Sequence, residues 1–251
     1  MEEQAPSAPT ISFSDIIINV FASPSEAFEG LRTSPVRATV WVVPLILLIL
    51  LSSGSQYLMN SNESLKAQSQ ETMRQVYQRQ VESKRMTQEQ ADQTMERMEG
   101  MGGVMIAVRI VGTTIFFVVV FFLAALVLWP LGKLSLKATA SYGKYLELWG
   151  ASQWISILGI VVTMGLVLGL NSIYASPSAA LAVYSTYDLF SSTHRILSLL
   201  NLFSIWQFLL VGIGLSTYAQ KPLPVGIGLA MGLWLIWTAI MYFFSSAAMG
   251  G

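Results

Sequence analysis

Three kinds of side chain are missing or scarce in this 251-residue chain. It has no cysteine and one histidine, and only 11% of its residues are charged. Without cysteine there is no disulfide, no thiolate metal site and no cysteine nucleophile, and a lone histidine lacks the partners that a zinc site needs. The 14 basic and 14 acidic side chains cancel, and the basic ones are scattered. The chain therefore has no electrostatic footprint for nucleic acid.

The sequence patterns of common catalytic and nucleotide-binding sites are missing as well. None of the patterns G-x-x-x-x-G-K-[ST], H-E-x-x-H, G-x-S-x-G and G-x-G-x-x-G occurs in the sequence. No acid, base and nucleophile stand in a recognisable catalytic arrangement. We therefore expect a protein that is not an enzyme, with no catalytic residue, no cofactor and no bound metal.

Long apolar runs make up most of the rest of the chain. Hydrophobic residues account for 53% of the sequence, against roughly 45–50% in soluble domains. A helix needs about 20 mostly apolar residues to cross a bilayer core of about 30 Å. Five segments meet this condition, and they lie in residues 36–59, 104–131, 148–170, 196–218 and 223–244. The sequence predicts an all-α membrane protein with five transmembrane helices in contact with the lipid bilayer.

The region before the first span, residues 1–35, has the pattern of a cytoplasmic tail followed by two interfacial helices. Apolar side chains from Phe13 to Phe21 recur at the spacing of one helical face. Ser23 begins a second helix, and its distance from Glu26 predicts a side-chain capping box. Two arrangements remain open: the helices lie in the headgroup plane, or they pack on the flank of the bundle.

A charged helical arm outside the membrane separates the first two spans, in residues 60–103. The pattern predicts two helices that meet near Thr87, and Thr87 and Gln90 have capping-box spacing. A short isolated helix is marginal in water, so the arm must pack on something. It either closes on itself as a hairpin or binds another chain. The candidate partner-binding residues are Met73, Val76, Tyr77, Met95 and Met98.

Loop charge predicts the orientation of the bundle. Lys133, Lys137 and Lys144 lie between the second and third spans, whereas loop 171–195 has Arg195 as its sole lysine or arginine. By the positive-inside rule, the amino terminus and the lysine-bearing loop are cytoplasmic, and the arm and the carboxyl terminus lie outside. The basic residues of the arm oppose this assignment on a bare count, but acidic residues accompany them. We expect the outer loop to lie against the root of the arm.

Small and polar side chains within the predicted spans mark faces where helices pack or where a substrate passes. Glycines allow close helix approach in membranes, and several here have G-x-x-x-G spacing. The candidate packing residues are Gly165, Gly169, Gly212, Gly214, Gly228 and Gly232. A polar row along the fourth predicted span consists of Ser198, Asn201, Ser204 and Gln207. This row either forms hydrogen bonds between helices or lines a substrate path.

Two segments carry a family resemblance. Residues 13–50 contain an interfacial helix, the turn FASPSEAF at 21–28, and Pro44 inside the first span. Residues 201–215 read NLFSIWQFLLVGIGL and are followed by Trp234 in the fifth span. With five spans after a cytoplasmic amino-terminal region, the chain resembles the Yip (Ypt/Rab-interacting protein) family in its bacterial form.

The resemblance implies a non-enzymatic protein of the bacterial cytoplasmic membrane that assembles with itself or with other membrane proteins. Eukaryotic Yip proteins are associated with Rab-type GTPases, but the arm departs from their compact pattern, and we do not carry GTPase binding over to this chain. The leading hypothesis is a scaffold or an assembly or accessory factor for other membrane proteins, such as a transporter complex. The alternative is a small-molecule permease or channel that uses the polar row of the fourth span.

Overall fold

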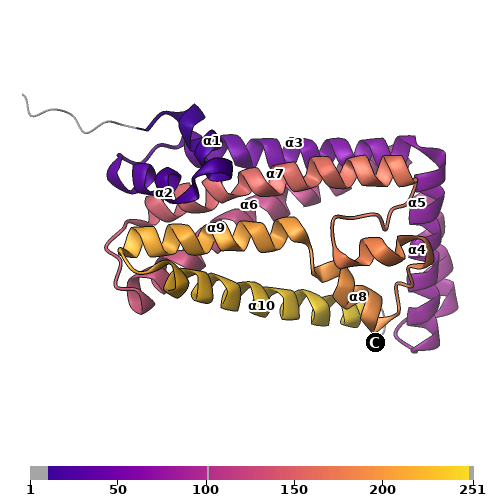
Figure 1. Ribbon diagram of the computed structural model, residues 1–251. Coiled ribbons are helices and arrows are strands. Elements are labelled where there is room, and N and C mark those ends of the chain that lie inside the picture. Colours follow the sequence, from indigo (N-terminus) through magenta and orange to yellow (C-terminus); the bar gives the residue numbers. More distant parts are fainter. Residues whose placement is uncertain (1–10, 101, 249–251) are drawn as a thin grey trace, which may run out of the picture. The chain divides into compact units, whose positions relative to one another are not determined.

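The described part of the chain is almost entirely helical. The structure is a computed structural model, and it describes residues 11–100 and 102–248. Apart from an isolated bridge between Ser178 and Asn201, these ranges contain no β-structure. The elements in Figure 1 are α1 (Phe13–Ala22), α2 (Pro24–Thr33), α3 (Thr39–Ser61), α4 (Glu63–Glu82), α5 (Gln88–Gly100), α6 (Gly102–Ser135), α7 (Tyr142–Leu170), the 3-10 helix η1 (Ala179–Thr186), α8 (Ser192–Leu199), α9 (Leu202–Ala219) and α10 (Leu223–Ala248).

Within the described residues, five helices are long and apolar enough to cross a membrane. They are α3, α6 from Ala107 onward, α7, α9, and α10 as far as Ala247. The shortest is α9 with 18 residues, which is close to the length of about 20 that a bilayer core requires. The expected all-α protein with five membrane-spanning helices is confirmed.

The chain divides into two compact units, which we describe separately. Unit 1 consists of Met1–Leu48, Phe117–Leu158 and Phe203–Trp234, and unit 2 consists of Ile49–Phe116, Gly159–Leu202 and Leu235–Gly251. The helices α1 and α2 and nearly all of α9 belong to unit 1, while α4, α5, η1 and α8 belong to unit 2. The helices α3, α6, α7 and α10 contribute residues to both.

Local hydrogen bonds fix the starts of the two amino-terminal helices. Ser12 caps α1, because its Oγ accepts the N–H of Asp15 at 3.1 Å. Pro24 opens α2, where its fixed φ suits the first helical position. The predicted capping box at Ser23 is wrong: with φ of −144° and ψ of 69°, this residue makes no side-chain cap bond. Its backbone carbonyl accepts the N–H of Glu26 at 2.9 Å instead.

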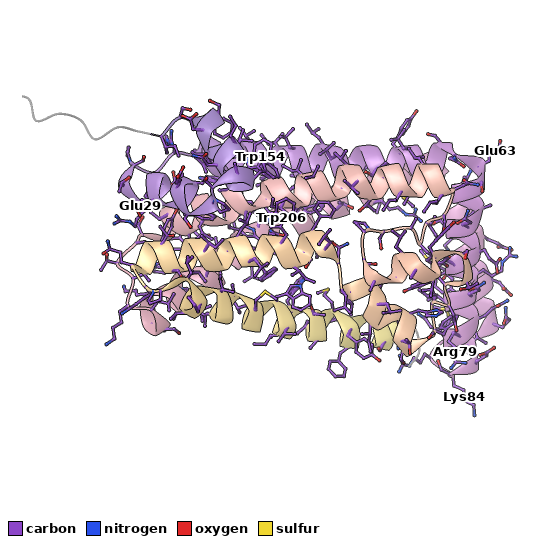
Figure 2. All side chains as sticks on the ribbon, viewed as in Figure 1. Glu29, Glu63, Arg79, Lys84, Trp154 and Trp206 are labelled. Atoms are coloured by element: carbon purple, nitrogen blue, oxygen red, sulfur yellow. The ribbon has the colours of Figure 1, made fainter. Side chains whose placement is uncertain are left out.

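The amino-terminal helices pack on the membrane helices of unit 1. Phe13 meets Trp154 of α7 edge-on with ring centroids 6.3 Å apart, and Phe21 meets Trp206 of α9 at 6.0 Å. Both tryptophans are labelled in Figure 2. Of the two arrangements left open by the sequence, the structure shows packing on the flank of the bundle. The side chains without any exposed surface are Ile16, Val20, Ala27, Phe28 and Leu31.

The arm in unit 2 consists of the two expected helices, α4 and α5. Asn62 caps α4 by accepting the N–H of Leu65 at 3.2 Å. The predicted capping box of α5 is confirmed: Thr87 Oγ1 accepts the N–H of Gln90 at 3.2 Å, and Gln90 Oε1 accepts the N–H of Thr87 at 3.0 Å. Between the helices, Lys84 has a φ of 58° in the left-handed region. This turn brings α5 back onto α4, so the two helices pack against each other.

The fourth predicted span is interrupted in the structure. The sequence predicts one helix over 196–218, whereas α8 and α9 are separated by a break. Here the Leu200 carbonyl accepts the N–H of Ala179 at 3.2 Å, and the N–H of Leu202 donates to the Pro177 carbonyl at 3.0 Å. These bonds to an upstream segment replace helical ones, so the spanning helix is α9 and α8 is a separate helix.

Candidate functional site

A buried ion pair lies in the first turns of α7 in unit 1. Lys144 Nζ and Glu147 Oε2 are 2.7 Å apart. Glu147 has no exposed surface, and Lys144 is 8% exposed. Lysine and glutamate are almost never buried to this degree unless they are paired. The two side chains are therefore buried as an ion pair within unit 1.

Both members of the pair also bind backbone groups near the end of α2. Lys144 Nζ donates to the carbonyls of Leu31 and of Ser34, the latter at 2.6 Å. Glu147 Oε1 accepts the backbone N–H of Arg37 at 2.7 Å. A lysine at a helix carboxyl end compensates the unpaired carbonyls and the helix dipole there. We call Arg37, Lys144 and Glu147 the charge cluster.

The charge cluster was not predicted from the sequence. The hydropathy pattern places Lys144 and Glu147 in a loop and predicts a third span that begins at residue 148, whereas α7 begins at Tyr142. The assignment is wrong because hydropathy rejects charged residues even where they pair with each other inside a helix. Their spacing of three residues, which places both side chains on one helical face, was the available signal.

Two buried tyrosines lie beside the charge cluster. Tyr145 of α7 and Tyr218 of α9 meet edge-on with ring centroids 6.0 Å apart. Within the described part of the chain, neither hydroxyl has a hydrogen-bond partner. Gly132 of α6 makes room for one of them, because an added Cβ would lie 2.7 Å from Tyr145 Cζ. The helices α6, α7 and α9 are thus in close contact around these rings.

Two members of the predicted polar row form hydrogen bonds between helices of unit 1. Gln207 of α9 is 7% exposed. Its Oε1 accepts a hydrogen bond from Ser156 Oγ of α7 at 2.7 Å, and its Nε2 donates to Ser152 Oγ at 3.5 Å. Ser204 Oγ accepts the indole N–H of Trp234 of α10 at 2.8 Å. These contacts connect α9 to α7 and to α10.

The other two members of the polar row belong to unit 2 and to different local structures. Ser198 near the end of α8 donates to the carbonyl of Arg195 at 2.7 Å. Asn201 lies in the break between α8 and α9, where it pairs with Ser178 in the isolated bridge. These two residues therefore stand in other local structures than Ser204 and Gln207, which lie within α9.

The candidate glycines fall into two groups. At Gly212 of α9, an added Cβ would lie 2.5 Å from Ile227 Cα of α10. At Gly214 it would lie 2.9 Å from Leu148 Cγ and 3.1 Å from Phe28 Cδ1. An added Cβ would meet no atom within 4 Å at the other candidates, which are Gly165, Gly169, Gly228 and Gly232.

The structure also has a packing glycine that the spacing motif did not reveal. Gly150 of α7 lies against α3, where its added Cβ would be 2.5 Å from Trp41 Cα and 2.7 Å from the Val40 carbonyl oxygen. That carbonyl is the one that Pro44 cannot bond, because proline has no N–H. The proline in α3 and the glycine in α7 thus occur at the same helix contact.

The arm docks on loop 171–195 within unit 2, as expected from the sequence. Leu65 of α4 has no exposed surface and packs with Val167 and Ala175. Farther along α4, Thr72 Oγ1 and the Tyr174 hydroxyl are 2.7 Å apart. Gln68 and Asn171 add a hydrogen bond at 2.9 Å, from Nε2 to the backbone carbonyl. The guanidinium of Arg79, labelled in Figure 2, stacks over the Phe190 ring at 5.8 Å.

The candidate partner-binding residues of the arm are not among those docking contacts. Met73, Val76 and Tyr77 of α4 and Met95 of α5 are half-buried. The side chain of Met98 lies outside the described residues. The described residues contain no group of three or more histidine, cysteine, aspartate or glutamate side chains that could hold a metal ion.

Comparison with known proteins gives one result. The family model of the Yip1 domain matches residues 18–222, a stretch that includes the charge cluster, the arm and the break before α9. No curated protein and no solved structure gives a significant match to the chain.

Proposed function

The chain belongs to the Yip1 domain family, and from this premise we propose that this integral membrane protein is a scaffold or assembly factor for other membrane proteins. It acts by holding partners together, and we assign it no catalytic step and no GTPase partner. Its site of action is the bacterial cytoplasmic membrane. The partner is a second copy of the chain or another membrane protein.

The observation that carries this proposal is a set of exposed or half-buried glycines in the membrane-spanning helices, at which the described chain leaves room for a further side chain. On α7, Gly165 and Gly169 are four residues apart, and on α10, Gly228 and Gly232 have the same spacing. An added Cβ at any of these positions would meet no atom within 4 Å. Small residues at this spacing allow a helix of another chain to approach closely in a bilayer. We propose that the arm adds contacts outside the membrane through the half-buried residues Met73, Val76, Tyr77 and Met95.

Crosslinking in intact membranes tests the proposal. A photo-reactive amino acid at Leu168, which is 44% exposed on α7, is expected to give covalent adducts with a second copy or with another membrane protein. The double substitution Gly165→Leu and Gly169→Leu is expected to remove most of the adduct, because two bulky side chains keep a partner helix at a distance.

Gly112→Leu is the matched control. Gly112 of α6 also has no atom within 4 Å of an added Cβ, but it has no second glycine four residues away. Its replacement by leucine is expected to leave the adduct unchanged. Recovery of monomer alone from every variant, including the one with wild-type glycines, would remove the support for a scaffold.

Labelling of introduced cysteines tests the proposed orientation, which has the amino terminus in the cytoplasm and the carboxyl terminus outside. Because the chain has no native cysteine, single cysteines at Ser69, Ser141 and Ser185 can be probed with an impermeant thiol reagent. We expect labelling at Ser69 and Ser185 and protection at Ser141, which lies in the lysine-bearing loop. Labelling of Ser141 alone among the three would invert the orientation.

The permease alternative has no observation in its favour. Ser204 and Gln207 are engaged by Trp234 and Ser156 within unit 1. Side chains whose hydrogen bonds are used between helices are not available to a passing substrate. We therefore propose no second function.

A further inference from the structure

The guanidinium of Arg37 has one partnered and one unpartnered edge. Its Nη1 donates to the backbone carbonyl of Ile11 at 2.8 Å. Its Nε and Nη2 are shielded from solvent and have no hydrogen-bond partner in the described part of the chain. These two nitrogens form the side of the guanidinium that presents two parallel N–H donors. Buried donors of this kind are rarely left without an acceptor.

Arg32 shows what the same edge binds elsewhere in unit 1. Its Nε donates to Glu29 Oε2 at 2.9 Å, and its Nη2 donates to Glu29 Oε1 at 2.5 Å. This is the bidentate geometry in which arginine holds an oxyanion. These hydrogen bonds lower the pKa of the Glu29 carboxyl below its ordinary value. Glu29 is labelled on α2 in Figure 2.

Among the described residues, the charge cluster carries one positive charge more than it carries negative ones. The charge cluster contains two cations, Arg37 and Lys144, and one carboxylate, Glu147. Each carboxylate oxygen accepts a hydrogen bond from another donor, Oε2 from Lys144 Nζ and Oε1 from the backbone N–H of Arg37, and neither accepts one from the Arg37 guanidinium. All three hydrogen-bond donors of the lysine are used as well. Within the charge cluster, the side-chain donors without an acceptor are therefore those of the Arg37 guanidinium.

We propose that the Nε–Nη2 edge of Arg37 binds a phosphate oxyanion, supplied by a phospholipid headgroup or by free phosphate. Arg37 lies two residues before Thr39, where the first membrane-spanning helix begins. Headgroup phosphates lie at the ends of such helices. The neighbouring residues Pro35, Val36 and Ala38 are exposed and Arg37 itself is half-buried, so the connection lies at the surface of unit 1, and a small rotation of the Arg37 side chain would turn its shielded edge toward a headgroup. The inference is independent of the proposed scaffold function.

Binding measurements on the purified full-length protein in mild detergent test this site. The probes are dihexanoyl phosphatidylglycerol, inorganic phosphate, and a dihexanoyl glycerol that lacks phosphate. We expect the phospholipid to bind and the phosphate-free lipid not to bind. Arg37→Gln is expected to weaken binding about tenfold or more, because two charge-assisted hydrogen bonds are lost. Inorganic phosphate binding as tightly as the phospholipid would assign the site to free phosphate.

Two further variants test whether binding depends on the two parallel N–H donors of Arg37, and not on its charge alone or on a change of the fold. Arg32→Gln makes the same chemical change at a nearby arginine whose paired donors already bind Glu29. We expect it to leave the dissociation constant within about twofold of wild type. Arg37→Lys keeps the positive charge beside Glu147 but lacks the two parallel N–H donors, and is expected to weaken binding severalfold.

Size-exclusion chromatography and helical circular dichroism report whether each variant is folded. If Arg37→Gln does not fold, Arg37→Lys decides the question. Wild-type affinity in a folded Arg37 variant would overturn the proposal. An equal loss of affinity in Arg32→Gln, or no phosphate-dependent binding by the wild-type protein, would do so too.

Discussion

Replacing Glu147 by leucine is expected to lower the free energy of unfolding by about 3–5 kcal/mol. The carboxylate has no exposed surface, and it accepts hydrogen bonds from Lys144 Nζ and from the backbone N–H of Arg37, each at 2.7 Å. Leucine would leave a buried ammonium without its counter-charge and a backbone donor without an acceptor. Unfolding by sodium dodecyl sulfate in mixed micelles, followed by circular dichroism, measures the change.

A double variant separates the charge effect from packing. When Lys144 is replaced by methionine together with Glu147→Leu, no unpaired ammonium remains, and we expect a smaller loss of stability than in Glu147→Leu alone. Glu29→Leu removes a carboxylate from an exposed ion pair with Arg32, and we expect it to change stability by less than about 1 kcal/mol. If Glu147→Leu and Glu29→Leu had equally small effects, the charge cluster would not stabilise unit 1.

The charge cluster explains how the short amino-terminal helices are held on the membrane helices of unit 1. Apolar burial of Phe28 and Leu31 attaches α2 to its neighbours, but apolar contacts do not fix where the chain turns into α3. Lys144 fixes this point by binding the Leu31 and Ser34 carbonyls. The cluster therefore defines the geometry of the connection that carries Arg37.

The features predicted well from sequence depend on local patterns. The membrane-spanning helices follow from runs of apolar residues, and the two helices of the arm follow from helical periodicity and from the reciprocal capping of Thr87 and Gln90. The capping prediction failed at Ser23, because its backbone conformation differs from that of a usual N-cap although the spacing is right. Spacing identifies candidates for capping but does not fix the dihedral angles.

The features missed from sequence depend on residues far apart in the chain. The break before α9 arises from hydrogen bonds to Pro177 and Ala179, more than 20 residues upstream. Lys144 and Glu147 are buried within a helix, where they pair with each other and with backbone groups of the connection between α2 and α3. The spacing of glycines likewise does not tell which side of a helix contacts another helix. It could not distinguish glycines that pack against a neighbouring helix, such as Gly212, from those that do not, such as Gly228.

Replacing Gly212 by alanine is expected to destabilise the protein by about 1–3 kcal/mol, the usual range for overpacking. Gly212 and Gly226 occupy the contact between α9 and α10 in unit 1, and an added Cβ at Gly212 would lie 2.5 Å from Ile227 Cα and 2.9 Å from the Ile227 nitrogen. These are backbone atoms, so no side-chain rotation relieves the clash and the two helices must separate. Unfolding in mixed micelles again measures the change.

Gly228→Ala on α10 is the matched control. An added Cβ at Gly228 meets nothing within 4 Å, and alanine in a helix interior is favoured over glycine by about 0.5–1 kcal/mol. We therefore expect this variant to be as stable as wild type or slightly more stable in detergent. If Gly212→Ala were as well tolerated as Gly228→Ala, α9 and α10 could not be in backbone contact at Gly212. The opposite signs of the two effects would show that Gly212 packs within the chain, whereas Gly228 remains free to contact a partner.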